Sequence, residues 1–330
     1  MSAVLVTGGA GYVGSHVVRR LREAGREVVV VDDLSQGHRD AVGDTPLIEA
    51  DFGEAAMLDD VLSGGKVRFI LHLAASASVG ESMGDPSRYY RNNVTRSLTL
   101  LDSARRHDVR GTIFSSSAAV YGDPLDLPIT EEHPLRANNP YGESKLVVER
   151  ALSWYHRAYG TRYVTLRYFN AAGAHPDGDL GEHHDPETHL IPRLLRAAAA
   201  GGPPTPVFGD DYPTTDGTCV RDYVHVLDIA DAHVRALDAL ERGDLEAEAF
   251  NLGSGEGFSV REVVDMVARV TGTPPPVERA PRRAGDPAIL VAASDRAQRR
   301  LGWKRAFPSL ESIVRTAWGW HRDHPRGFAG

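Results

Sequence analysis

The feature that most constrains the fold is a glycine-rich stretch that follows a short apolar run near the N-terminus. Gly8, Gly11 and Gly14 recur at three-residue spacing, directly after an expected strand at Val4–Thr7 and at the start of an expected helix at Val13–Ala24. This spacing permits a tight turn, a close approach of the backbone to a diphosphate, and close packing of helix on strand. Because the N-terminus of the helix then faces the negative charge, the pattern predicts a dinucleotide site.

An aspartate at the end of the second expected strand, residues 28–32, indicates which dinucleotide is bound. Asp32 lies 21 residues after Gly11, where an acidic residue can accept hydrogen bonds from the adenosine ribose. Asp33 follows it, so a 2′-phosphate would meet two carboxylates and no cation, and NAD is favoured over NADP. The alternative for Asp32 is a solvated turn aspartate. Asp51, at the end of the third strand, could reach the adenine or serve in a turn.

Short β-branched runs alternate with helical stretches through the N-terminal half. Beyond the first two strands we expect others at 47–51, 69–73, 112–116 and 163–167, with helices at 87–106 and 141–159. Such alternation implies right-handed crossovers and a parallel sheet covered on both faces. The expected fold class is therefore α/β, a doubly wound parallel Rossmann-type sheet formed by residues 1–173.

The pattern becomes less regular after residue 173. Residues 174–187 and 201–218 indicate loops, and the remaining elements are expected at 220–225 (strand), 227–240 (helix), near Phe250 (strand), from Ser259 with Glu262 in a capping box (helix), and 310–321 (helix). We expect residues 174–330 to form a smaller mixed α/β domain over the carboxyl edge of the sheet, where ligands of open α/β folds bind. The boundary is approximate, and strand exchange near 220–251 stays open.

A tyrosine and a lysine four residues apart on the expected helix at 141–159 indicate proton-transfer chemistry. Tyr141 and Lys145 share one helix face, so the ammonium can favour the phenolate of a base whose pKa starts near 10. With 11 tyrosines and 3 lysines in 330 residues, chance predicts about 0.1 such pairs. Ser117, at the end of the fifth strand, would hydrogen-bond the reacting hydroxyl. The alternative is a surface pair and a loop serine without catalytic roles.

Composition excludes several other classes of protein. The net charge of −8 argues against a nucleic-acid binder, which would carry a basic surface. No apolar stretch approaches the roughly 20 residues of a membrane span, and no signal-peptide pattern opens the chain. Cys219 is the only cysteine, so no intrachain disulfide can form. We therefore expect a cytoplasmic enzyme with a small-molecule substrate, acting on neither nucleic acid nor membrane.

Longer strings around these residues resemble a known family. The three glycines, Ser117 and the Tyr141/Lys145 pair are similar to those of the extended short-chain dehydrogenase/reductases. The strings at 79–82, 114–122, 167–170, 173–176, 220–223 and 251–253 resemble those of its UDP-galactose (UDP-glucose) 4-epimerases, and the likeness runs essentially from end to end. Fold analogy alone would leave the chemistry open. Strings of this length at the expected site specify the chemistry much more closely than the fold does.

This resemblance implies an enzyme that retains NAD and interconverts UDP-galactose and UDP-glucose through a 4-keto sugar. Tyr141 would take the proton of the sugar 4-hydroxyl, while hydride leaves C4 and later returns to the opposite face. Besides the glycines, Asp32, Asp51, Ser117, Tyr141 and Lys145, the resemblance implies cofactor contacts from Tyr12, Val13, Phe52, Leu73, Ala74, Ala75, Asn92 and Phe169. Besides Ser117 and Tyr141, it implies substrate contacts from Asn170, His189, Val207, Phe208, Arg221, Arg283, Asp286 and Ile289. A homodimer through the helices at 87–106 and 141–159 is implied as well.

Departures from the family pattern leave the preferred sugar open. Ala77 and Ala119 stand where lysine and threonine are frequent, His189 replaces an asparagine, and Ile289 occupies a position that sets the size of the sugar pocket. A 4-epimerase of a UDP-N-acetylhexosamine, UDP-uronate or UDP-pentose is therefore an alternative. A 4,6-dehydratase is disfavoured because no carboxylate follows Ser117. A non-catalytic NAD-binding regulator could have lost Tyr141 or Lys145 freely.

Histidines in the loop before residue 190 raise the question of a metal. His183, His184 and Asp185 lie close to His189 in the sequence. The stretch has no cysteine and falls on the segment expected to meet substrate, so we expect a solvated or substrate-facing loop and no metal.

Overall fold

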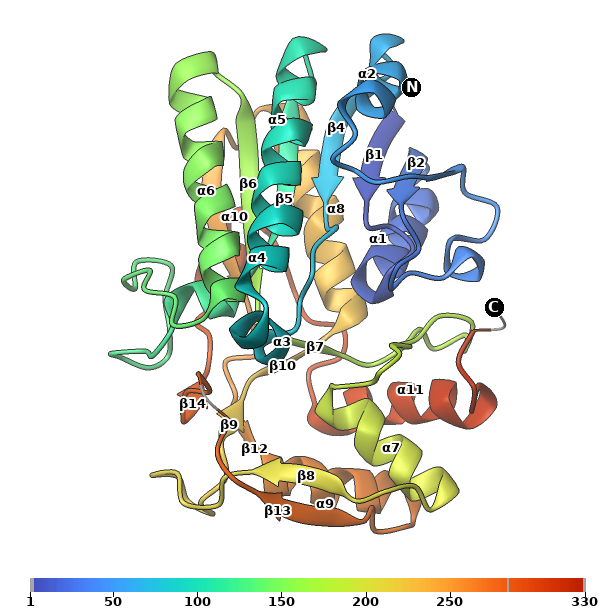
Figure 1. Ribbon diagram of the computed structural model, residues 1–330, viewed down its shortest axis with the longest axis vertical. Helices are drawn as coiled ribbons and strands as arrows, with labels where there is room; N and C mark the ends of the chain where they lie inside the picture. Colours follow the sequence, from blue (N-terminus) through green and yellow to red (C-terminus); the bar gives the residue numbers. More distant parts are fainter. Residues whose placement is uncertain (1–2, 284, 329–330) are drawn as a thin grey trace.

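A seven-stranded sheet dominates the computed structural model, which describes residues 3–283 and 285–328 (Figure 1). The strand order is β11-β6-β5-β4-β1-β2-β3, and every neighbouring pair is parallel. The strands are β1 (Ala3–Thr7), β2 (Glu27–Asp32), β3 (Leu47–Glu49), β4 (Val67–His72), β5 (Gly111–Ser117), β6 (Arg162–Tyr168) and β11 (Ala247–Leu252). This arrangement confirms the doubly wound α/β fold.

Helices cover both faces of the sheet because its strands are apolar on both sides. On one face, α1 (Tyr12–Glu23) and α8 (Val226–Arg242) pack against side chains such as Val6. On the other, α2 (Ala55–Ser63) and α5 (Arg96–Arg106) pack against neighbours such as Leu5, and α6 (Pro140–Tyr159) packs beside α5. Leu5 and Val6 show the alternation of strand side chains, which here places apolar groups in two separate cores.

The single helix expected at 87–106 is interrupted. It consists of α4 (Pro86–Tyr89), a π-helical turn at Tyr90–Thr95 and α5. A π-turn accommodates one extra residue, which changes the direction of the side chains before and after it, and such turns are frequent at functional sites. Asn92 lies within this turn.

A smaller part of the chain lies beyond the carboxyl ends of the strands, below the sheet in Figure 1. Its helices α7 (Leu190–Ala200), α9 (Val260–Thr271) and α11 (Leu310–Asp323) share one apolar core. Two-stranded sheets form between β7 (Asn170–Ala172) and β10 (Tyr223–His225), and between β8 (Thr205–Phe208) and β13 (Val277–Ala280). A third sheet has the order β12-β9-β14, from Phe258–Ser259, Val220–Arg221 and Ile289–Leu290. The capping box of Ser259 and Glu262 opens α9 as expected.

Two expectations about this half need correction. The segment 201–218 is not loop throughout, because β8 lies within it. The strand expected at 220–225 is divided into β9 and β10, which belong to different sheets. The chain then returns to the large sheet through α8 and β11, within the region where strand exchange was left open, so residues after 173 also build the N-terminal layer. Among the described helices, none has the length and apolar character needed to cross a membrane.

Candidate active site

The glycine turn between β1 and α1 contains two kinds of glycine. Gly8 has a φ of +73°, and a Cβ there would lie 2.5 Å from the Ala74 nitrogen. A Cβ on Gly14 would lie 1.9 Å from the Gly8 oxygen. These two glycines are therefore required by packing within the chain. At Gly11 the nearest atom to an added Cβ would be 3.5 Å away, an ordinary contact, so the free chain does not require glycine at this position.

The start of α1 is open to an anion. Gly11 is its N-cap and has no side chain to satisfy the first amides, and the first turn carries no acidic residue. Free amides at a helix N-terminus together with its dipole favour a phosphate group. Tyr12 anchors this end of the helix, because its hydroxyl donates to the carbonyl of Gly173 at 2.7 Å. Val13 follows in the same turn of the helix.

Asp32, the residue expected to bind the adenosine ribose, contacts the glycine turn between β1 and α1. Its Oδ2 accepts from the Ala10 amide at 2.9 Å and its Oδ1 from the Leu34 amide at 3.0 Å. Burial raises the pKa of Asp32, and the two backbone donors oppose that rise. A carboxylate has about four acceptor positions, so two remain for a ribose diol. Asp33 is exposed and accepts from Ser35.

The loop after β4 forms the other wall of the turn. The amides of Leu73 and Ala74 both donate to the Thr7 carbonyl at 3.0 Å, and Ala75 follows them. Asn92, from the π-helical turn, donates to the Ser76 hydroxyl at 3.2 Å and so reaches this loop. The expected cofactor residues at the ends of β1 and β4 are therefore neighbours.

Two further expected cofactor residues follow β3. Asp51 lies just beyond the strand, which ends at Glu49, and it accepts from the Gly53 amide at 2.8 Å and pairs with Arg96. Phe52 is buried. Both a turn function and a place beside the adenine remain compatible with these contacts of Asp51.

Tyr141 is placed by the start of α6. Asn139 caps this helix by accepting from the Gly142 amide at 2.9 Å, and a Cβ on Gly142 would lie 2.3 Å from the Ala119 oxygen. The helix therefore approaches the end of β5 closely, which places Tyr141 near Ser117. Burial raises the pKa of Tyr141, and the Ser117 hydroxyl lowers it.

Lys145 lies one turn further along α6 and is buried. Its Nζ donates to the Ser115 carbonyl at 2.8 Å and lies 4.9 Å from the centre of the Phe114 ring. Burial lowers the pKa of Lys145 to about 7, and the carboxylate of Glu149, one further turn along, opposes this effect. Tyr141 and Lys145 thus both lie where α6 meets the end of β5, Tyr141 near Ser117 and Lys145 on the Ser115 carbonyl.

A buried ion pair between Glu149 and Arg167, which sequence reasoning missed, packs next to these residues. Glu149 accepts from the Ser116 hydroxyl and from Arg167, whose Nη2 lies 2.6 Å from the carboxylate. Arg167 also donates to the Tyr121 hydroxyl at 2.9 Å, and Tyr121 donates to Asn251 at 2.7 Å. No local spacing signals these partners, because they come from β5, α6, β6 and β11.

Two arginines gather on the opposite side of the site, in the smaller part of the chain. Arg221 is buried, and its Nη2 lies 3.7 Å from Asp286 and has no hydrogen-bond partner among the residues that the structure describes. Arg283 donates to Asp286 at 2.9 Å and lies 5.3 Å from the ring centre of Phe208, which follows Val207 in β8. A buried guanidinium with an unused donor is suited to a diphosphate.

A family model described as the NAD dependent epimerase/dehydratase family matches residues 4–253. The chain belongs to this family. The match spans the glycine turn, the Ser117–Tyr141–Lys145 group and β11, which are the elements that build the sheet and its carboxyl edge.

Individual relatives match over nearly the full chain. UDP-glucose 4-epimerase of Halalkalibacterium halodurans is 49% identical over 327 residues, which cover 99% of this chain and 98% of the relative. The crystal structure of UDP-glucose 4-epimerase from Brucella ovis in complex with NAD has a TM-score of 0.93 at 48% identity, covering 96% of this chain and 98% of that one. The enzyme from Bifidobacterium longum in complex with NAD+ and UDP has a TM-score of 0.95 at 38% identity, covering 99% and 100%.

The remaining expected substrate residues lie on separate elements of this family member. Asn170 begins β7 with an exposed side chain, and Ile289 lies in β14 next to Val220 of β9. Phe169 is buried, and its amide donates to the Leu252 carbonyl at 3.2 Å.

His189 was expected in a solvated or substrate-facing loop, and it lies in the loop that precedes α7. His189 is itself exposed, but its Nδ1 contacts Glu182, whose side chain is only 4% exposed. Glu187 has the same low exposure. The loop therefore carries buried carboxylates, which the spacing of its histidines did not indicate.

Proposed function

We propose that this protein interconverts UDP-glucose and UDP-galactose by NAD-dependent 4-epimerisation. The observation that carries the proposal is the buried Tyr141–Lys145 pair next to Ser117, at the same sheet edge as a glycine turn whose helix is open to a phosphate. Relatives named UDP-glucose 4-epimerase, matched over nearly their whole length, support it. An NAD-binding regulator without catalysis would have no need of the tyrosine–lysine pair.

The proposed NAD site fits the residues present. The diphosphate would lie on the start of α1 in the space beside Gly11, and the adenosine ribose would lie on Asp32. The remaining contacts would come from Gly8, Tyr12, Val13, Gly14, Asp51, Phe52, Leu73, Ala74, Ala75, Asn92 and Phe169, together with Ser117, Tyr141 and Lys145. When bound, NAD supplies a hydride acceptor for sugar C4 and the hydride donor for the return step.

The chain's own residues would move the proton. Tyr141 takes the proton of the sugar 4-hydroxyl as hydride leaves C4, and it returns that proton once hydride has come back to the opposite face. The Lys145 ammonium stabilises the phenolate, and Ser117 hydrogen-bonds the reacting oxygen. The carboxylate of Glu149 favours the charged form of Lys145, which offsets part of the cost of burying it.

The substrate would be held by its diphosphate, so that the keto sugar can turn over between the two hydride steps. Arg221 and Arg283 would bind the diphosphate, with Asp286 orienting both guanidinium groups. Val207 and Phe208 would contact the nucleoside, and Asn170, His189 and Ile289 would complete the pocket. The Nη2 of Arg221, which finds no hydrogen-bond partner in the described part of the chain, supports this assignment.

A coupled assay with UDP-galactose, UDP-glucose, UDP-N-acetylglucosamine and UDP-uronates would test the proposed function. We expect turnover of UDP-galactose, and its loss in Tyr141→Phe with the fold retained. Tyr155→Phe is a matched control on the same helix, since Tyr155 bonds Asp102 away from the sheet edge. No turnover of any UDP-sugar by the NAD-loaded wild type would refute the proposal.

We also propose a homodimer, a cytoplasmic location, and a division of labour at about residue 173. The dimer would form through residues 87–106 and 141–159, where Tyr90, Trp154 and Tyr159 are exposed. Residues 1–173 would bind NAD and 174–330 the UDP-sugar, with α8 and β11 belonging structurally to the first part. Light scattering of wild type and Trp154→Glu would test the dimer, and cell fractionation the location.

A further inference from the structure

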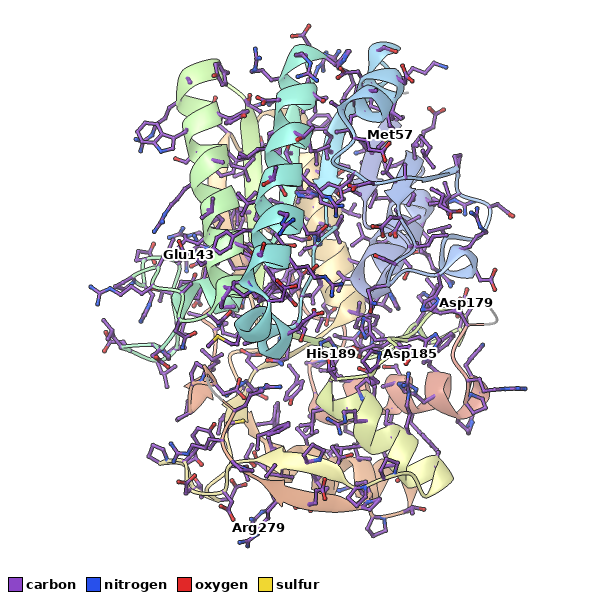
Figure 2. The ribbon with its side chains drawn as sticks, in the orientation of Figure 1. Met57, Glu143, Asp179, Asp185, His189 and Arg279 are labelled. Atoms are coloured by element: carbon purple, nitrogen blue, oxygen red, sulfur yellow. The ribbon has the colours of Figure 1, made fainter. Side chains whose placement is uncertain are left out.

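The segment from residue 182 to residue 189 brings four ligand-type side chains to one point. Glu182, His184, Glu187 and His189 each offer one carboxylate oxygen or imidazole nitrogen, and these atoms all lie within 4.8 Å of one another. Figure 2 labels His189 and Asp185, which lie where the carboxyl edge of the sheet meets the smaller part of the chain. None of the proposed proton-transfer steps uses this cluster. His189 is also one of the residues proposed to complete the substrate pocket, but its Nδ1 faces Glu182, which leaves Nε2 for the pocket.

The distances within the cluster fit a small tetrahedral cation. His184 Nδ1 lies 3.4 Å from Glu182 Oε1 and 3.7 Å from Glu187 Oε1. Zinc binds nitrogen and oxygen at about 2.0–2.2 Å in tetrahedral sites, so two of its ligand atoms lie roughly 3.3–3.6 Å apart. The His184 and His189 rings are nearly perpendicular, at 80°, and their centres are 5.2 Å apart. His189 Nδ1 and Glu182 Oε1 are in direct contact, so these two side chains would have to move apart for all four ligand atoms to surround one ion.

Burial and charge also favour a cation here. The side chains of Glu182 and Glu187 are each only 4% exposed, and a buried carboxylate needs a paired charge. Within the described part of the chain, Glu187 Oε2 is buried without a hydrogen bond, and the guanidinium of Arg196 approaches it only to 3.6 Å. Without an ion, the two carboxylates are paired with His184 and His189. A divalent ion would replace these pairings and neutralise both carboxylates, with the two histidines as neutral ligands.

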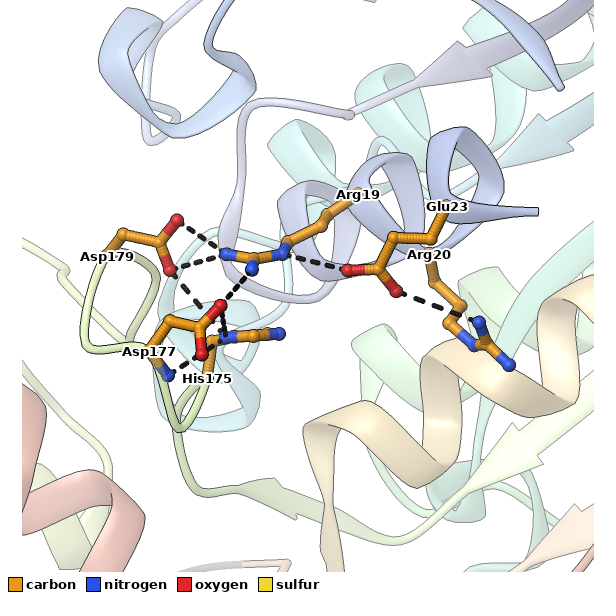
Figure 3. Close-up of polar contacts among 6 residues, drawn as sticks. All are labelled: Arg19, Arg20, Glu23, His175, Asp177 and Asp179. Carbon is orange, nitrogen blue, oxygen red and sulfur yellow. Dashed lines mark hydrogen bonds and ion pairs between the residues drawn. The ribbon is translucent and has the colours of Figure 1, made fainter. Parts of the chain in front are cut away.

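A second group of ligand-type residues lies nearby and differs from the first in its burial and in the compensation of its charge. His175, Asp177 and Asp179 also converge, but both aspartates are exposed and paired with Arg19 from α1 (Figure 3). A guanidinium already compensates their charge, and the carboxylates are hydrated. This second group therefore serves as a control for the first.

We propose that Glu182, His184, Glu187 and His189 form a structural zinc site. Two imidazoles and two carboxylates suit Zn²⁺, whereas Mg²⁺ and Ca²⁺ prefer ligand sets made only of oxygen. With four protein ligands the ion has no open position for water, so its function is to hold the chain. His184 lies against Tyr12, with ring centres 6.4 Å apart, and His189 is the N-cap of α7. The ion therefore ties the loop before α7 to the start of the dinucleotide-binding helix.

Metal content measured on tag-free, NAD-loaded protein tests this proposal. The protein is stripped with a chelator, incubated with ZnCl₂, freed of unbound metal by gel filtration, and assayed for zinc per chain. We expect one zinc ion per chain in the wild type and in Asp177→Asn. We expect at least a tenfold loss of zinc affinity in Glu182→Gln and in His184→Gln, each of which removes one ligand.

Cobalt provides a second measurement that needs no variant. Co²⁺ bound to the wild-type cluster should give the strong visible absorption of a tetrahedral site, and added Zn²⁺ should abolish it. Zinc at background level in the wild type, unchanged affinity in Glu182→Gln, or a weak octahedral cobalt spectrum would each overturn the proposal and leave an ion-paired cluster only. None of these measurements uses turnover, so they are independent of the proposed epimerase activity.

Discussion

Gly11→Ala separates what the protein chain requires at the glycine turn from what a bound dinucleotide requires. In the free chain an added Cβ at residue 11 meets nothing closer than 3.5 Å. The residue has φ −78° and ψ 176°, a conformation that alanine adopts freely. We therefore expect the variant to fold, with stability unchanged or raised by about 0.4–1 kcal/mol through the smaller entropy of its unfolded chain.

NAD binding should respond in the opposite direction. The methyl group would occupy the space through which the backbone approaches the diphosphate, and overpacking of this kind costs about 1–3 kcal/mol. At tenfold per roughly 1.4 kcal/mol, affinity for NAD should fall about 5- to 140-fold. Gly14→Ala provides the contrast, because its Cβ would lie 1.9 Å from the Gly8 oxygen and the turn itself must move.

The assay combines thermal unfolding with the NAD content of gel-filtered protein, read as dinucleotide released on denaturation. Gly11→Ala should keep the melting temperature of NAD-free wild type and lose NAD, whereas Gly14→Ala should lose both. Full retention of NAD by Gly11→Ala would refute the assignment of this space to the diphosphate. An unfolded Gly11→Ala would refute the analysis of packing in the free chain.

Other substitutions test the rest of the site. Tyr141→Phe should lower turnover at least about 10²-fold, the usual effect of losing an acid–base group, with NAD content unchanged; near-native activity would contradict the mechanism. Asp32→Ala should weaken retention of NAD, and recovery of NADP from the wild type would show that Asp32 and Asp33 were misinterpreted. The pKa of Lys145 is about 7 in the folded chain, against about 10.4 when unfolded. The unfolded chain therefore binds more protons between these pH values, and the stability of NAD-free protein should rise from pH 7 to pH 9. Urea melts should show a smaller rise in Lys145→Met, and an equal rise would mean that Lys145 is not buried as described.

Local spacing explains why much of the catalytic group could be predicted from the sequence. The glycine turn and the Tyr141/Lys145 pair each depend on residues within one turn or one helix face, where distance follows directly from sequence separation. Ser117 was predictable because carboxyl ends of parallel strands meet at one edge. The parallel direction of the strands in the large sheet was predictable from the alternation of strands and helices. The pairing of β11 with β6 was not, because it joins segments about 80 residues apart.

Features that depend on distant partners could not be predicted in this way. The buried pair of Glu149 and Arg167 is held by packing of α6 on the sheet, and neither residue lies in a distinctive pattern. Strand β8 follows a Pro/Gly-rich stretch and pairs with β13, about 70 residues later, so neither strand has a local signal. Helix α7 was missed because Pro192 lies within it, although the first turn of a helix tolerates proline. The low exposure of Glu182 and Glu187 likewise could not be predicted, because it depends on packing against α7 and not on local spacing.

The sugar pocket gives the last prediction, because β14 resolves which of two residues can line it. Successive side chains of a strand point to opposite faces, so Ile289 and Leu290 cannot both face the sugar. Leu290 packs against the apolar cluster of Ala118, Val120, Tyr121 and their neighbours, whereas Ile289 is half-buried and belongs to none of the described core clusters. Ile289 is therefore the side chain available to a ligand. It is smaller than tyrosine but stiff at its first side-chain torsion.

We expect UDP-glucose and UDP-galactose to interconvert, with UDP-N-acetylglucosamine accepted at a measurable, lower rate. Ile289→Tyr should selectively reduce activity on the acetylated sugar, and Leu290→Met, the matched control, should leave the ratio of the two activities unchanged. Wild type inactive on the acetylated sugar would refute the open pocket, and an unaltered ratio in Ile289→Tyr would show that residue 289 does not line it.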